Sequence, residues 1–406
     1  MTRLQPVDTV EVPEVDERVP DVAAIVRHRS VTPLFQPIVE LDTGTVVAVE
    51  ALARGPAGSV LERPDHLFAA ASRAGLLGPL DLLCAERAIE CALEAADPPP
   101  MLFVNAEPAV LDQAVSPRLI ELLLSDLPFR IVTEYTERAL STFPAALLRI
   151  AGQSHLLGNG IALDDVGADP MSLAFLPFID PDVIKLDMHL LRHPSASSTV
   201  EVCTVVAAAA RRSGAVVIAE GVETEADVEV ARSLGAAWGQ GWHFGRPARA
   251  GDLQLQVLGA APTLRDARPG LHQPLGSPFD VAVADVAGLA LDTAVVPTLE
   301  RMSAAVDGQR HAVVLGSYCD PGDVLPWLPH IERVTRQAIY TSILGPDSSP
   351  EPFPGESSLV VMTPDYAAAL CRRPGAGLVV TESRDTVAAI GRVLLQRLTP
   401  PTPGGL

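Results

Sequence analysis

Acidic and amide side chains stand at the ends of short apolar runs in the first part of this sequence. The runs include VVAVEALA, MLFVNA, RIVTEY, GIALDD, DVIKLD and AVVIAEG. The polar residues at or near their ends are Glu50, Asn105, Glu134, Asp164, Asp165, Asp187 and Glu220. Carboxylate and amide oxygens are the ligands that Mg²⁺ and Mn²⁺ prefer. Taken alone, the Asp164–Asp165 pair also fits ordinary turn chemistry, because aspartate bonds to nearby backbone groups.

The alternation of patterns predicts the elements that hold these residues. The apolar runs are typical of buried strands, and the longer Ala/Leu-rich stretches PDHLFAAASRAGLL and VEVCTVVAAAARRSG are typical of helices. Strand–helix alternation over residues 21–258 predicts a parallel sheet with helices outside, closed into a barrel. In such a barrel the C-terminal ends of the strands share one face, where barrel enzymes build their sites. We therefore expect the polar residues to meet at that face.

Composition excludes several classes of protein. The formal net charge of −20 argues against a general nucleic-acid-binding surface, which needs basic patches. The five cysteines lack zinc-ribbon or CxxC spacing, which favours reduced thiols, and no histidines have HExxH spacing. The sequence shows neither a signal peptide nor an apolar run of transmembrane length. We expect a soluble cytoplasmic protein without a membrane span.

Residues 30–250 carry seven motifs that resemble the EAL domain, the cyclic di-GMP phosphodiesterase family. In order they are FQPIVELDTGTVVAVEALAR, LFVNAEP, TEYTE, LDD, IKLD, IAEGVET and GQGWHFGRP, and residues 50–52 are the triplet that names the family. The resemblance implies a TIM-like (β/α)₈ barrel that hydrolyses cyclic di-GMP to linear pGpG in bacterial second-messenger signalling. It also implies two divalent ions, Mg²⁺ or Mn²⁺, and a homodimer formed through this domain.

The same resemblance implies a role for each matched residue. The metal ligands would be Glu50, Asn105, Glu134, Asp164, Asp165 and Asp187. The residues that act at the attacking water would be Lys185, Glu220 and Gln240, with Lys185 either orienting the water or deprotonating it. The substrate-binding residues would be Gln36, Leu52, Arg54 and Pro247, with Arg54 pairing with a phosphate oxygen. The supporting residues would be Glu137, which anchors the loop after the aspartates, and Glu223.

That loop departs from the family pattern. It reads DDVGADPMSL here, whereas typical active members read DDFGTGYSSL. Pro170 stiffens the backbone and removes a hydrogen-bond donor. The altered residues, Val166 to Met171, suggest a catalytically impaired EAL domain that acts as a cyclic di-GMP receptor. Retention of the matched site residues favours an active phosphodiesterase, and we place this hypothesis first.

The remaining sequence predicts a second, smaller α/β domain. Residues 1–20 are expected to form a flexible leader, residues 259–278 a Pro/Gly-rich linker and residues 399–406 a disordered tail. Within residues 279–398 the expected strands are HAVVLGSY, QAIYTSIL, SLVVMT and GLVVTES. The expected helices are VVPTLERMSAAV, LPWLPHIERVTRQ, DYAAALCR and DTVAAIGRVLLQRL. This unit resembles DICT-type sensory domains, and a role in protein interaction or dimerisation is the alternative. Its ligand or partner is not indicated by any motif.

Overall fold

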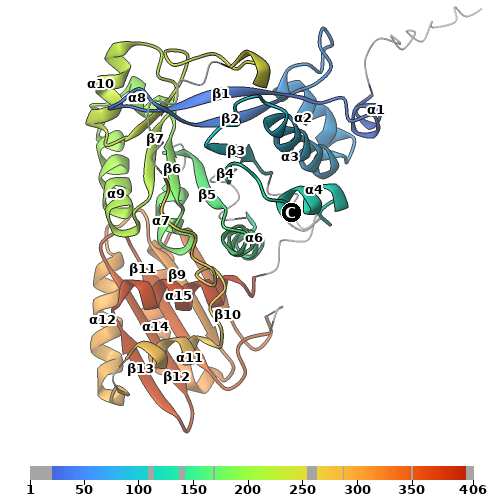
Figure 1. The fold of residues 1–406 in the computed structure, drawn as a ribbon. Helices are drawn as coiled ribbons and strands as arrows, with labels where there is room; N and C mark the ends of the chain where they lie inside the picture. Colours follow the sequence, from blue (N-terminus) through green and yellow to red (C-terminus); the bar gives the residue numbers. More distant parts are fainter. Residues whose placement is uncertain are drawn as a thin grey trace, which may run out of the picture.

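Strands β1 to β8 close into a barrel with helices packed around it (Figure 1). The computed structural model describes residues 21–107, 114–136, 142–167, 170–253, 263–286, 288–348 and 351–398. The strands are β1 Thr32–Glu40, β2 Val46–Arg54, β3 Met101–Asn105, β4 Arg130–Thr136, β5 Gly160–Val166, β6 Val183–Leu186, β7 Val216–Ala219 and β8 Trp238–Gln240. The helices are α1 Val22–Arg27, α2 Pro64–Arg73, α3 Leu77–Leu93, α4 Pro117–Leu123, α6 Pro144–Leu156, α7 Pro170–Ile179, α8 Met188–Arg192, α9 Ser197–Ser213 and α10 Glu225–Ser233. No helix among the described residues is long and apolar enough to cross a bilayer. The expected leader, the expected tail and Glu137 lie outside the described residues.

One strand departs from the parallel sheet that the sequence predicts. β1 pairs antiparallel with β2 and with β8, whereas the neighbours from β2 to β8 pair in parallel. The cause is the link between β1 and β2, because residues 41–45 are too few for the crossover that a parallel pair needs. They close a hairpin instead, in which Gly44 adopts a φ of 71°. The hairpin places Gln36 directly opposite Glu50.

A second sheet follows in the order β10-β9-β11-β12-β13. Its strands are β9 Val313–Tyr318, β10 Tyr340–Leu344, β11 Ser357–Met362, β12 Ala367–Arg373 and β13 Gly377–Thr381, and its helices are α11 Pro278–Asp285, α12 Val295–Val306, α13 Pro321–Val324, α14 Leu328–Gln337 and α15 Arg384–Leu395. Alternate strand residues face opposite sides of the sheet. Val314 packs in one cluster with α12 and α14, whereas Val313 packs in another with α15. Helices therefore cover both faces of this mixed sheet (Figure 1).

The expectation that DYAAALCR forms a helix is wrong, because Ala367–Arg373 is strand β12. Alanine favours helices in isolation. Here Thr363 donates its N–H to the Tyr366 carbonyl at 2.8 Å and closes a tight turn. The chain then pairs on both sides, with β11 and with β13, and residues 367–371 are all buried. Sheet pairing and burial on both faces override the local preference of the alanines.

The second sheet and the barrel share one apolar core through α7 and α15. Ile390 of α15 lies in the same buried cluster as Phe175 and Phe178 of α7. Gly391 permits the close approach, since a Cβ at this position would lie 2.2 Å from the Phe178 ring. Phe175 also meets Tyr340 of β10 edge to face, with ring centroids 4.9 Å apart. The two parts of the chain are thus packed directly against each other.

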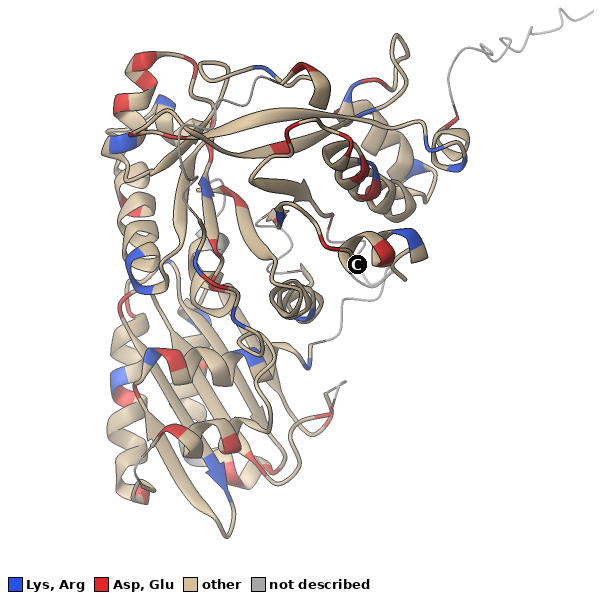
Figure 2. Cartoon of the chain, in the orientation of Figure 1, with Lys and Arg blue, Asp and Glu red and all other residues tan. Residues whose placement is uncertain are grey.

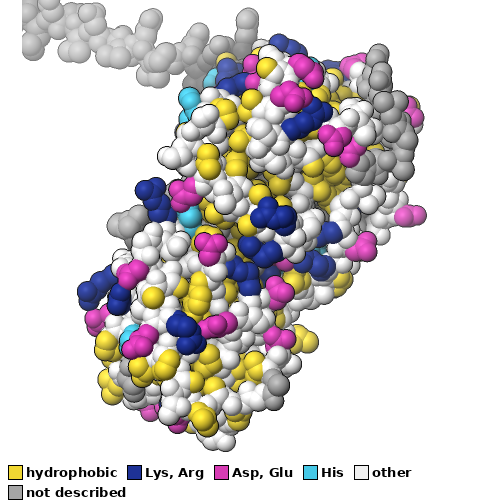
Figure 3. All heavy atoms as spheres, turned by 90° about the vertical axis from the view of Figure 1, so that its left-hand side faces the viewer, with side chains coloured by type: hydrophobic (Ala, Val, Ile, Leu, Met, Phe, Trp, Pro, Cys, Tyr) yellow, Lys and Arg dark blue, Asp and Glu magenta, His cyan; other side chains and the backbone are white. Residues whose placement is uncertain are grey.

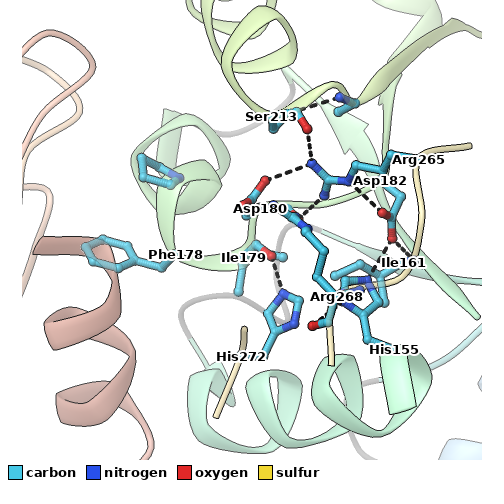
Figure 4. A network of polar contacts seen from close by, with 12 residues as sticks. His155, Ile161, Phe178, Ile179, Asp180, Asp182, Ser213, Arg265, Arg268 and His272 are labelled. Atoms are coloured by element: carbon cyan, nitrogen blue, oxygen red, sulfur yellow. Dashed lines mark hydrogen bonds and ion pairs between the residues drawn. The ribbon is translucent and has the colours of Figure 1, made fainter. Parts of the chain in front are cut away.

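A buried polar network ties the segment after β8 to the barrel. Figure 3 shows basic side chains gathered across the middle of one face of the molecule, and Figure 4 shows the polar network around Asp182 and Arg265. Asp182 is fully buried and accepts hydrogen bonds from Arg265 Nε at 2.7 Å and from the Ile161 N–H at 2.9 Å. His155 Nε2 lies 2.9 Å from the same carboxylate. Burial opposes ionisation of Asp182, but His155 and Arg265 outweigh it and lower its pKa to about 2.

The segment expected as a linker supplies part of this network. Of its described residues, Leu264 packs among apolar side chains of the barrel strands, and His272 is fully buried against the Ile179 carbonyl at 2.6 Å. Burial lowers the pKa of His272 to about 3, so this side chain is neutral at ordinary pH. Gln396, just after α15, donates to the His272 carbonyl at 2.6 Å. The Pro/Gly-rich composition did not reveal this packing.

Arg392 of α15 gives a direct test of the contact between the two parts. Its Nε donates to the Phe178 carbonyl at 2.8 Å and its NH2 to the Pro177 carbonyl at 3.2 Å, and only 3% of the residue is exposed. We expect Arg392→Met to lower the free energy of unfolding by about 2 kcal/mol, because it leaves buried carbonyls unpaired. Chemical denaturation of the full chain measures the change.

The matched control is Arg336→Met on α14, where the ion pair with Glu332 is exposed. We expect a loss there of less than about 0.5 kcal/mol. Equal losses in the two variants would contradict the role given to Arg392.

Candidate functional site

Lys185 lies among four carboxylates, three on other strands of the barrel and one directly after a strand. Its ammonium nitrogen is 2.7 Å from Glu220 Oε1, 2.9 Å from Glu134 Oε1, 3.1 Å from Asp164 Oδ1 and 3.5 Å from Glu50 Oε2. Lys185 belongs to β6, and its partners lie on β2, β4 and β5 and directly after β7. Figure 2 shows acidic positions on barrel strands β2 and β5. The barrel therefore brings together residues that are spread over 171 positions of sequence, from Glu50 to Glu220.

Amide side chains from neighbouring strands orient Glu50. Asn105 Nδ2 on β3 donates to Glu50 Oε1 at 2.8 Å, and Gln240 Nε2 on β8 donates to Glu50 Oε2 at 2.6 Å. Gln240 Nε2 also lies 3.3 Å from Gln36 Oε1 on β1, and Gln36 Nε2 donates to the Gly245 carbonyl at 3.2 Å. Both oxygens of Glu50 are thus held in a defined orientation by hydrogen bonds.

The two adjacent aspartates reach the same site because the strand that carries them is irregular. Successive side chains of a regular strand point to opposite faces. In β5 the pairing with β6 shifts register between Leu163 and Val166, and Asp165 adopts a left-handed φ of 58°. Aspartate tolerates this conformation better than most residues. Carboxylate oxygens of Asp164, Asp165 and Glu220 consequently lie within 4.8 Å of one another.

The close carboxylates change one another's ionisation. Burial disfavours the ammonium of Lys185, but the carboxylates of Glu134, Glu220, Glu50 and Asp164 outweigh it and raise its pKa well above the ordinary value. Burial and the charge of Glu50 raise the pKa of Glu134, and burial raises that of Glu220 to about 8 against the opposing effect of Lys185. The surrounding carboxylates therefore favour the protonated form of Lys185.

The residues present fit divalent cations. Five carboxylates, from Glu50, Glu134, Asp164, Asp165 and Glu220, face a single ammonium. Glu134 Oε2 and Gln240 Oε1 are buried and accept no hydrogen bond within the described part of the chain. Every one of these ligand atoms is oxygen, which is the preference of Mg²⁺ and Mn²⁺. A bound cation would offset both the excess negative charge and the unpaired oxygens.

Two of the expected substrate-binding residues line a cleft next to Asn105, and Pro247 lies elsewhere, after β8. Leu52 and Arg54 line a cleft of about 220 Å³ together with Asn105. The Arg54 guanidinium is half-buried, and its NH1 donates to the Ala53 carbonyl at 2.8 Å. Pro247 lies in the segment after β8, next to Ala248, whose N–H donates to the Phe35 carbonyl of β1 at 3.0 Å.

Asp187 and Glu223 lie at the edge of the cluster. The Asp187 side chain accepts the His189 N–H at 2.6 Å at the start of α8, and its negative charge contributes to the raised pKa of Asp165, behind burial and Asp164. Glu223 is an exposed residue that pairs with Arg192 at 3.4 Å. Neither carboxylate is among those that contact Lys185.

Two features were not used in the sequence analysis. Lys185 is the only lysine in the sequence, so every other permanently charged basic side chain is an arginine. The compact ammonium of a lysine can donate hydrogen bonds in several directions, whereas the donors of a guanidinium lie in one plane.

Asp81, buried in α3, lines the same cleft as Arg54, and burial raises its pKa to about 7. An acidic residue within the apolar run LGPLDLLCA was the available signal for Asp81.

Comparisons with known proteins agree with this geometry. A family model described as "EAL domain" matches residues 21–247. The chain is 31% identical over 228 residues to the probable cyclic di-GMP phosphodiesterase PdeB of Escherichia coli K12, covering 54% of this chain and 43% of PdeB. It is 30% identical over 239 residues to the cyclic di-GMP phosphodiesterase RocR of Pseudomonas aeruginosa, covering 56% of this chain and 61% of RocR. The chain thus matches less than two thirds of either relative. A solved structure described as PaMucR phosphodiesterase in complex with c-di-GMP superposes with a TM-score of 0.50 at 26% identity, covering 57% of this chain and 96% of that one.

The single lysine makes its ionisation directly measurable. Selective ¹³C labelling of lysine at Cε gives one lysine NMR signal, which reports on Lys185 alone. In the metal-free protein we expect this signal to titrate above the ordinary lysine pKa of about 10.4, because the surrounding carboxylates stabilise the ammonium. The urea-unfolded chain is the control and should titrate near that ordinary value. A folded-state midpoint at or below it would contradict the arrangement described.

The left-handed Asp165 gives a second test. Both Asp165→Gly and Asp165→Ala remove the carboxylate, but only glycine adopts a positive φ without steric cost. We therefore expect the glycine variant to be more stable than the alanine variant by about 1 kcal/mol, measured by chemical denaturation. On a regular strand the order would be reversed, and that result would exclude the left-handed conformation.

Proposed function

The chain belongs to the EAL domain family, and on this premise we propose that it is a metal-dependent phosphodiesterase that hydrolyses cyclic di-GMP to linear pGpG. The observation that carries the proposal is the burial of Lys185 among Glu50, Glu134, Asp164 and Glu220 at the C-terminal ends of the strands. Buried carboxylates on this scale are costly unless a cation compensates them. The functions named for PdeB and RocR supply the reaction class.

We propose two divalent ions, Mg²⁺ or Mn²⁺, as the cofactors. The first would be held by Glu50, Asn105, Glu134 and Asp164, and the second by Asp165 with Asp187 beside it. Bound ions of this kind neutralise charge on a phosphodiester and lower the pKa of a bound water. Gln240 and Asn105 would keep the Glu50 oxygens in position, as they do in the metal-free protein.

Other residues would act on the substrate and the water. The protonated Lys185 would orient the attacking water by donating to it, and Glu220, 2.7 Å from Lys185, would accept a hydrogen bond from the same water. Arg54 would pair with a phosphate oxygen, because its guanidinium lies beside Asn105 in the same cleft. Gln36, Leu52 and Pro247 would complete the binding surface, and Glu137 and Glu223 would support it.

The altered loop after Asp165 favours a second candidate function, that of a cyclic di-GMP receptor. Helix α7 begins at Pro170, three residues after Gly167. Proline suits the first position of a helix, where its missing N–H costs nothing. Residues Val166 to Asp169 separate the aspartates from α7. Such a loop could hold the ligand without supporting turnover.

The second sheet, the homodimer and the cytoplasmic location belong to the same proposal. A sensory role of the DICT type for the second part and a dimer through the barrel follow from the family resemblance. Size-exclusion chromatography with light scattering tests the dimer, and its outcome does not bear on the chemistry of the site.

A turnover assay tests the proposed reaction. We expect the wild-type chain with Mg²⁺ or Mn²⁺ to convert cyclic di-GMP to linear pGpG, resolved by chromatography, and a chelator to stop the conversion. Glu50→Gln should lower kcat at least about 100-fold, because it removes a charged ligand and its hydrogen-bonded support. Glu40→Gln is the matched control, since Glu40 lies on the adjacent strand and accepts a hydrogen bond from Thr43 instead.

Two other results would be decisive. If the protein binds cyclic di-GMP tightly but forms no product with either metal, the phosphodiesterase proposal is wrong and the receptor function takes its place. If Glu50→Gln turns over cyclic di-GMP at the wild-type rate, the carboxylate site around Lys185 does not catalyse the hydrolysis.

A further inference from the structure

A cleft of about 460 Å³ lies where the barrel meets the second sheet, away from the carboxylate site. The barrel side is lined by the end of α7 and by α9, including Pro177, Asp180 and Arg212. The other side is lined by one face of α15, including Arg384 and Ala389. The volume is in the range of roughly 300–1,000 Å³ that small-molecule sites have.

The charge of this cleft is opposite to that of the whole protein. Four arginines line it, at positions 212, 268, 384 and 392, against two aspartates, Asp180 and Asp385. The Asp180 carboxylate is already paired, with Arg265 at 3.1 Å and Arg268 at 2.8 Å. Four arginines in one cleft are unusual in a chain whose net charge is −20, and they favour an anionic ligand.

Two of the arginines repel each other. Burial lowers the pKa of Arg384, and the charge of Arg212 lowers it further. Arg384 donates hydrogen bonds to the Thr363 and Pro364 carbonyls, whereas exposed Arg212 forms no ion pair with any of the described residues. Arg268 Nε is buried and also lacks a hydrogen-bond partner in the described part of the chain. An anion between these groups would relieve the repulsion and accept the free donors.

Most of the remaining lining is apolar, although Ser213 also lines the cleft. It includes Leu176, Pro177, Pro181 and Leu271 on one side and Ala388 and Ala389 on the other. Inorganic phosphate would leave this surface in contact with water, whereas a ligand with an apolar or aromatic body would cover it. Guanidinium forks match the oxygens of a phosphate group.

We propose that this cleft binds a small organic phosphate, with the phosphate group at Arg212 and Arg384 and an apolar or aromatic body against Leu176, Leu271 and Ala389. Such a ligand would contact α7 and α15 at once. It would therefore strengthen the contact between the barrel and the second sheet, and α7 is the helix that follows the Asp164–Asp165 loop.

Isothermal titration calorimetry of the full chain tests the proposal, with phenyl phosphate as the probe. The titration is done at low salt with a chelator present. Without metal the carboxylate site repels anions, so a binding signal would not come from that site. We expect phenyl phosphate to bind with a Kd of about 1 mM or tighter, and at least ten times more tightly than inorganic phosphate. Arg212→Ala and Ala389→Glu should each weaken this binding at least ten-fold. Within the described residues, neither side chain makes a hydrogen bond or an ion pair, and unfolding curves confirm that the variants are folded.

Arg211→Ala is the matched control, because Arg211 is the exposed neighbour of Arg212 on α9 and does not line the cleft. It should bind the probe within two-fold of wild type. No detectable binding, equal binding of inorganic phosphate, or equal weakening by Arg211→Ala and Arg212→Ala would each overturn the proposal. Because the titration contains neither cyclic di-GMP nor metal, its outcome is independent of the proposed phosphodiesterase activity.

Discussion

The burial of one ammonium among carboxylates from four strands is the constraint on which the site depends. A buried lysine without partners would lose its proton, and buried carboxylates without partners would gain one. Here each group compensates the other, but only while β2, β4, β5, β6 and β7 stay closed around them. The closed barrel and the antiparallel hairpin at its opening strands are therefore part of the site. The ammonium compensates only some of the negative charge, and the proposed divalent cations would neutralise the remainder.

The irregular end of β5 links this constraint to the rest of the molecule. A left-handed Asp165 turns two neighbouring carboxylates toward one site, and the chain then enters α7. The other end of α7 is fixed by Arg392, which binds the Pro177 and Phe178 carbonyls, and by the ion pairs of Asp180. A single ten-residue helix thus joins the aspartate loop to the contact with the second sheet. Helix α15 therefore packs against the same helix that follows the aspartate loop.

Charge is distributed unevenly between these two ends of α7. The mouth of the barrel collects carboxylates, and the contact between the two parts collects arginines. Arginine suits the second place because its donors reach several carbonyls and carboxylates at once while it keeps its charge when buried. Even so, burial lowers the pKa of Arg392 to about 10, so this residue remains charged at neutral pH. The only lysine of the sequence lies at the mouth of the barrel, whereas the permanently charged basic side chains at the contact between the two parts are all arginines.

The sequence by itself determined the strands that carry the site and the residues on them. Apolar runs ending in Glu50, Asn105, Glu134, Asp164 and Glu220 are local patterns, and motifs in family order identify the barrel to which they belong. The helix expected at DYAAALCR failed because alanine preference is weak beside pairing on two sides. The direction of β1, the left-handed Asp165, the buried His272 and the arginine-lined cleft were decided only by the tertiary structure. Each depends on contacts between segments far apart in the chain, and periodicity along the sequence carries no information about which distant segment supplies a partner.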